Sequence, residues 1–403
     1  MSNSSLSSIN YLKPQSHSQT QTKWVLDNNQ KIFAASLKVI DLKFNPAQSK
    51  CFFPALTGAY ASIKTVQLKL NGILVDFWNS TSVIPYLLAM SGNNEKQIGI
   101  NAILYATGNN VKFDNETQLL SFNRPLVDAN SAQVKLNVYS DLLNHIGIIN
   151  DSLEIIIDWN TNPADLFCPQ DPLVPVINYN IEAPYLSFET MKQDFKQPEK
   201  IIYRQWVEDQ WVIPAIVGDK TAQTYELRSN AFMNKKLNRL LLTNTPTGYN
   251  TNADCAKLYN LFNRYMSVPM AGEVYNIAKE GKSILSFRGT ASDAVKMSIT
   301  HDTWGPACLS SAGHYHSRFS PVLQLKSDTE TGTPTVIVPS NQLNGYASWG
   351  CVEIADHVAQ DLALSYRRIS DVNANFPSLG TSLTISAVGE VLCMLVNGQK
   401  VYL

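Results

Sequence analysis

Residues 66–77 read VQLKLNGILVDF and contain the strongest structural signal in the chain. Apolar and polar residues alternate on both sides of Asn71-Gly72, and an Asn-Gly pair between two alternating runs is typical of a β-hairpin with a type I′ turn. Residues 391–403 repeat this design around Asn397-Gly398. Both halves of the chain are therefore predicted to contain antiparallel sheet.

A third strand signal lies between the two hairpins. Residues 153–159 read LEIIIDW, which places Leu153, Ile155, Ile157 and Trp159 on one face, as a half-buried strand requires. Strands of this kind are therefore expected in the middle of the chain as well as near its ends.

Helical periodicity is scarce. The best candidate covers residues 252–266, where apolar and aromatic residues recur at three- and four-residue steps. A weaker candidate covers residues 82–90, with Pro85 in its first turn. We therefore expect an all-β protein with one short helix inserted among the strands of each half.

The length of 403 residues exceeds what one hydrophobic core usually supports, which predicts two domains of about 150–200 residues each. From residue 24 onward, short apolar alternations separated by Asn, Gly and Pro are typical of β-sandwiches. Four X-Pro steps between residues 168 and 200 favour a boundary there. The expected organisation is a flexible N-terminal arm (1–22), a first sandwich (23–190) and a second sandwich (191–403).

The predicted arm is rich in Ser, Asn and Gln and poor in apolar residues. Such a composition cannot offset its own ordering entropy. Two interpretations remain open: a disordered tail, or an arm that becomes ordered only against a neighbouring subunit.

Composition and charge exclude several classes of protein. The net charge is −1 and charged residues make up 16% of the chain, so the basic footprint of a dedicated nucleic-acid binder is missing and we expect no direct sequence-specific nucleic-acid binding. The six cysteines are spread singly and are interpreted as reduced core residues. The N-terminus lacks the pattern of a secretory signal and no apolar run approaches the roughly 20 residues of a membrane helix, which predicts synthesis in the cell interior with no membrane span.

His314 and His316 are the most catalytic-looking residues, because two imidazoles at i and i+2 share one face of a strand and can share a metal. A cupin-like site would have a carboxylate four or five residues after the second histidine, where this chain has Ser320 and Pro321. No GxSxG elbow and no phosphate-binding glycine loop occurs. We therefore assign no catalytic, cofactor-binding or metal-binding residue and predict that the chain is not an enzyme.

The aromatic residues Trp206 and Trp211, in RQWVEDQWVIP, suit either a sandwich core, a subunit contact or a sugar-stacking surface. Core or interface is favoured, since large rings dominate buried area in both. The helix residues Tyr259, Phe262 and Tyr265 are the other predicted assembly residues.

Three stretches, residues 58–66, 143–155 and 383–398, resemble the double jelly-roll major capsid proteins of tailless icosahedral DNA viruses, of the polinton-like virus, adintovirus and virophage type. The first resembles the opening of the first roll, the second the strand that closes it, and the third the last strands of the second roll. The resemblance implies an all-β fold of two consecutive jelly-roll β-sandwiches with short inserted helices.

The same resemblance implies a structural virion protein that forms homotrimeric, pseudo-hexagonal capsomers. Its partners would be neighbouring capsomers together with penton and minor capsid proteins, and its location the virion. Two alternatives stay open: a carbohydrate- or receptor-binding spike or minor capsid protein, and a cupin-like β-sandwich enzyme built on the His314/His316 pair.

Overall fold

The structure is a computed structural model. It describes residues 8–27, 31–46, 51–52, 59, 62–79, 110–114, 119–123, 126–127, 134–138, 140–163, 168–169, 178–191, 198–214, 223–228, 231–232, 234–246, 274–279, 282–288, 324–327, 334–337, 350–358, 362–368 and 383–403. The described part is almost entirely antiparallel sheet, which confirms the predicted fold class.

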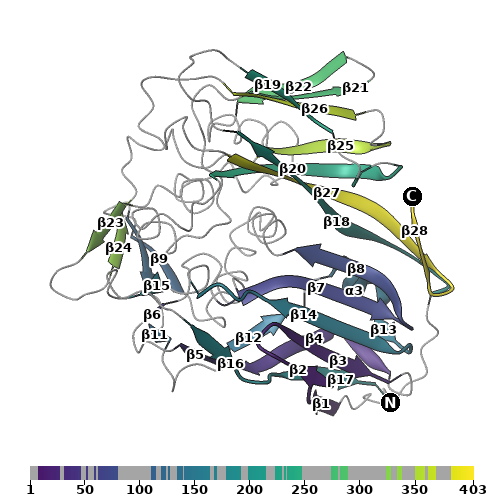
Figure 1. Ribbon diagram of the computed structural model, residues 1–403. Helices are drawn as coiled ribbons and strands as arrows, with labels where there is room; N and C mark the ends of the chain where they lie inside the picture. The colour runs from purple at the N-terminus through teal and green to yellow at the C-terminus, as the bar shows by residue number, and fades with distance from the viewer. Residues whose placement is uncertain are drawn as a thin grey trace.

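Two five-stranded sheets from the first half of the chain form the lower part of the molecule in Figure 1. One sheet contains, in spatial order, β2 (Ser16–His17), β3 (Gln21–Leu26), β14 (Leu153–Trp159), β7 (Ile63–Leu70) and β8 (Ile73–Asn79). The other contains β1 (Ser8–Leu12), β17 (Tyr185–Thr190), β4 (Ile32–Leu42) and β12 (Val134–Asn137), with β13 (Ile148–Ile149) also paired to β4.

The second half of the chain supplies two further sheets, in the upper part of Figure 1. The first contains β18 (Lys200–Ile213), β27 (Leu383–Val396), β20 (Lys236–Pro246) and β25 (Gly350–Val358), with β28 (Gln399–Tyr402) also paired to β27. The second contains β19 (Gln223–Leu227), β26 (Leu362–Arg368), β21 (Val274–Lys279) and β22 (Lys282–Arg288).

Small sheets made by connecting segments complete the described structure. They are β11 (Leu126–Val127) with β6 (Cys51–Phe52) and β15 (Cys168–Pro169), and β16 (Tyr179–Ile181) with β5 (Phe44–Pro46). A four-stranded sheet, in the order β23 (Gln324–Ser327), β24 (Pro334–Ile337), β10 (Leu119–Asn123) and β9 (Asn110–Asp114), combines strands from both halves. The two halves are therefore joined by hydrogen bonds between Leu120-Ser121 and Thr335-Val336.

Both predicted hairpins are confirmed. Asn71 and Gly72 have φ values of 48° and 78°, and Asn397 and Gly398 have φ values of 49° and 75°. Positive φ at both central residues is the defining feature of a type I′ turn, and Asn and Gly adopt it at least cost.

The predicted central strand is confirmed as β14, which lies between β3 and β7. Ile155 lies opposite both Trp24 and Leu68, and all three side chains are buried. Trp159 donates a 2.7 Å hydrogen bond from Nε1 to Thr22 Oγ1, so the buried polar atoms of this ring and this hydroxyl satisfy one another.

The prediction of a flexible arm over residues 1–22 is wrong for residues 8–22, and residues 1–7 lie outside the described residues. Residues 8–12 form β1, which pairs with β17 from Ser8↔Thr190 to Leu12↔Leu186, and residues 16–17 form β2. The polar side chains that suggested disorder make specific bonds: His17 Nε2 lies 2.9 Å from Ile181 O, and Gln19 Nε2 donates to the same oxygen. Residues 8–22 are therefore part of the first sandwich, because β17 supplies hydrogen-bond partners for the backbone of β1 and Ile181 O binds the polar side chains that follow it.

Both predicted helices, over residues 82–90 and 252–266, lie outside the described residues. The described part contains instead a short helix that the sequence reasoning missed, α3 (Asp141–Ile146). It buries Leu142, Leu143 and Ile146. No helix within the described ranges is long and apolar enough to span a membrane.

Candidate functional site: the junction between the two rolls

The two halves of the chain meet where β8 and β18 approach each other. Among the described strands, each of these two is the last in its own sheet, so each presents an edge without a further described partner in that sheet. Tyr203, on β18, crosses this gap: its hydroxyl donates a 2.7 Å hydrogen bond to Val75 O, and its side chain is only 1% exposed. Burial also raises the pKa of the Tyr203 phenol, which therefore stays protonated and remains a donor. Contact between the two rolls protects both edges from pairing with foreign strands.

A second bond crosses the junction from α3. The backbone N–H of Arg204 donates to Asp141 Oδ2 over 2.7 Å. Asp141 is the first residue of α3, and the helix packs against β18. Neighbouring residues of β18, Tyr203 and Arg204, thus bind two separate elements of the first roll.

Asp76 and Ser140 are the sequence neighbours of Val75 and Asp141, the two residues that accept these bonds. Ser140 Oγ donates to Asp76 Oδ2 over 2.5 Å, and both residues are buried. Burial raises the pKa of Asp76 to about 6, although the Ser140 hydroxyl, the Lys400 ammonium and the Phe77 N–H each lower it. The sequence alternation through residue 77 did not reveal this residue, because a register shift between Leu68 and Lys69 turns Asp76 inward and leaves Phe77 exposed.

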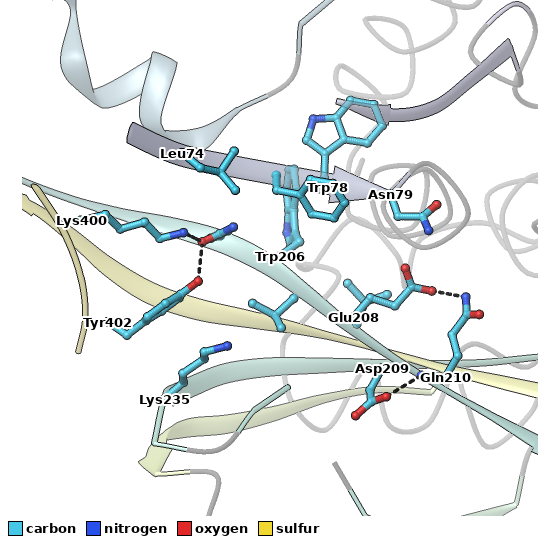
Figure 2. A pocket seen from close by; sticks show the side chains of 14 residues that line it. Leu74, Trp78, Asn79, Trp206, Glu208, Asp209, Gln210, Lys235, Lys400 and Tyr402 are labelled. Atoms are coloured by element: carbon cyan, nitrogen blue, oxygen red, sulfur yellow. Dashed lines mark hydrogen bonds between the residues drawn. The ribbon is translucent and has the colours of Figure 1, made fainter. Parts of the chain in front are cut away.

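The second roll contributes a polar cluster to the same place. Gln205 Oε1 accepts hydrogen bonds from Lys400 Nζ and, at 3.5 Å, from the Tyr402 hydroxyl (Figure 2). The ammonium groups of Lys235 and Lys400 lie 4.5 and 4.6 Å from the centroid of the Tyr402 ring. Burial first, and the nearby Lys400 second, lower the pKa of Lys235. The cation–π contacts offset part of the repulsion between the two lysines.

A groove of about 540 Å³ opens beside this cluster. Figure 2 shows Leu74 and Trp78 of β8 on one side, with Trp206 and Glu208 of β18 on the other. Its walls are apolar at the β8 side and polar at Glu208, Asp209 and Gln210. The groove therefore marks the part of the junction that the two rolls leave unfilled.

The two predicted tryptophans have different surroundings. Trp206 lines the groove, and Trp211 donates from Nε1 to Arg228 O over 3.0 Å. Both are half-buried and pack against the hydrophobic core. Their positions five residues apart on one strand do not bring them together.

The other predicted residues, Tyr259, Phe262 and Tyr265, together with His314 and His316, lie outside the described residues. Within the described residues, no group of three or more His, Cys, Asp or Glu side chains could hold a metal ion. The junction residues Asp76, Tyr203, Gln205, Lys400 and Tyr402 were all missed from the sequence. The one available signal was a carboxylate inside the apolar run ILVDFW.

No protein-family model and no curated protein sequence matches the chain. Solved structures do. PBCV-1 VP54, in a crystal structure fitted into a reconstruction of the virophage Sputnik, matches 100% of this chain and 98% of its own with a TM-score of 0.57 at 9% identity. A chain from the structure of the Sputnik virophage matches with a TM-score of 0.60 at 13% identity, covering 100% of this chain and 89% of that one. The Faustovirus major capsid protein matches with a TM-score of 0.50 at 8% identity, covering 98% of this chain and 91% of that one.

The chain has the double jelly-roll fold. The match extends over the whole chain and confirms the predicted fold of two consecutive rolls. In the double jelly roll, the junction described above is the contact between the first roll and the second.

Proposed function

We propose that this double jelly-roll chain is a major capsid protein that builds an icosahedral viral shell. One observation carries the proposal: the fold matches, over at least nine-tenths of both chains, a protein whose name is Faustovirus major capsid protein. Its expected location is the virion.

The surface of the first roll supports a role in assembly. Ile9 and Tyr11 are 59% and 63% exposed on β1, which is the edge strand of its sheet. Both lie on the outer face, opposite Glu189 and Ser187 of β17. Exposed apolar side chains on an edge strand favour association, so a neighbouring subunit that covers them would be stabilising.

The proposed assembly is a homotrimer with a pseudo-hexagonal outline, in contact with neighbouring capsomers and with penton and minor capsid proteins. A chain with two similar rolls suits this arrangement, because three copies present six rolls around a threefold axis. Trp206, Trp211, Tyr259, Phe262 and Tyr265 remain proposed contact residues.

Light scattering on the purified full chain tests the proposal. The expected particle has about three times the 44.8 kDa chain mass and persists on dilution, with hexagonal outlines in negative-stain images. The double variant Ile9→Asp/Tyr11→Asp should shift the particle toward monomer, whereas Lys64→Asp, an exposed change on another strand of the same roll, should not. A dilution-resistant monomer of the unaltered chain would refute the capsid proposal, and saturable glycan binding by that monomer would favour the receptor-binding alternative.

A further inference from the structure

The buried pair Asp76 and Ser140 occupies a special position in the chain. Residue 75, which precedes Asp76, accepts the cross-roll bond from Tyr203. Residue 141, which follows Ser140, accepts the cross-roll bond from the N–H of Arg204. Asp76 and Ser140 are therefore each joined through the chain to a residue that accepts a bond from the second roll.

The charged and titratable groups around Asp76 come from both rolls. Lys400 of β28 favours its ionised form, whereas Asp141 of α3 opposes it. Tyr203 of β18 and Cys393 of β27 also interact electrostatically with Asp76. Among the described residues, one cation therefore faces one buried carboxyl group, and burial outweighs that cation.

We propose that the junction is a proton-operated joint: protonated Asp76 holds the two rolls together, and loss of this proton loosens their contact. The neutral acid can remain in its buried site, where Ser140 donates to it. The ionised form gains by reaching water, which requires β8 and α3 to move away from β18. The inference goes beyond capsid assembly, because the joint lies within one chain.

The direction of the effect follows from linkage. Burial raises the pKa of Asp76 from 3.8 to about 6, so the closed junction favours the protonated form. Closure is therefore undiminished below pH 3.8, weakens progressively as the pH rises from there to 6, and changes little above that. Between pH 5 and pH 7.5 the open population should rise about tenfold.

Hydrogen exchange measured by mass spectrometry on the full chain tests the joint. Protection factors, which correct for the intrinsic pH dependence of exchange, should fall about tenfold in β8, α3 and the N-terminal half of β18 between pH 5 and pH 7.5. Asp76→Asn, which cannot ionise, should abolish this fall. Glu154→Gln, on the same roll in β14 and ion-paired to Lys23, is the matched control and should leave the fall intact.

If Asp76→Asn does not fold, two further variants still test whether protonation of Asp76 controls the junction. Lys400→Met and Ser140→Ala each remove a group that lowers the pKa of Asp76 in the closed junction. Each should therefore extend the loss of protection to higher pH and make the fall between pH 5 and pH 7.5 larger than in the unaltered chain. Protection that does not depend on pH in the unaltered chain, or a fall that persists in Asp76→Asn, would overturn the proposal. Neither result depends on whether trimers form, so failure of the joint and failure of the capsid proposal are distinguishable.

Discussion

Removing the Tyr203 hydroxyl should weaken the contact between the rolls without disturbing the core. Tyr203→Phe retains the ring, whose side chain is 1% exposed, and deletes only the oxygen that donates to Val75 O at 2.7 Å. The lost bond and the buried carbonyl left without its donor together predict a loss of about 1–3 kcal/mol in the free energy of unfolding. Equilibrium unfolding in urea, followed by tryptophan fluorescence, measures this loss as a lower midpoint.

Tyr402→Phe is the matched control for this prediction. Its hydroxyl lies 3.5 Å from Gln205 Oε1 and the residue is 40% exposed, so its loss should change the free energy of unfolding by less than about 0.5 kcal/mol. Equal effects of the two variants, or a Tyr203→Phe effect below about 0.5 kcal/mol, would show that the hydroxyl does not hold the rolls together.

Three other predictions concern buried groups. Gly389→Ala should lower the free energy of unfolding by about 1–3 kcal/mol, since the new Cβ would lie 2.6 Å from Leu237 Cδ2 and 2.8 Å from Phe232 Cε1; an unchanged midpoint would contradict this packing. The Cys393 thiol, whose pKa burial raises to about 11, should resist iodoacetamide at pH 8 in the folded protein and react readily in urea, as peptide mass spectrometry can measure. Asp76→Asn should raise the free energy of unfolding at pH 7.5 by up to about 3 kcal/mol and have little effect at pH 3.5, and a pH-independent difference would contradict the linkage.

Local signals predicted much of the sheet structure. The two Asn-Gly turns and the strand at residues 153–159 depend on residues close together in sequence, and each was found as expected. The six-residue helix α3 was missed because it is too short for periodicity to be visible, although Ser140-Asp141 followed by Leu142 and Leu143 offered a weak signal.

The junction could not be predicted because its contacts join distant parts of the chain. Tyr203 meets Val75 across 128 positions, and Gln205 meets Lys400 across 195. The ordered edge strand β1 has the same origin, since its partner β17 lies about 180 residues away in sequence. The local composition of these segments does not indicate which distant residues they contact, because those contacts form only in the folded chain.

The sheet of β9, β10, β24 and β23 is built from both halves of the chain, and this has a consequence for synthesis. Leu120 pairs with Val336, so during translation β10 is synthesised more than two hundred residues before its partner β24. At about 5–20 residues per second this interval lasts on the order of ten seconds or more. During that time one side of β10 is free to pair with a neighbouring nascent chain, and crowded polysomes should therefore favour entangled products over correctly closed subunits.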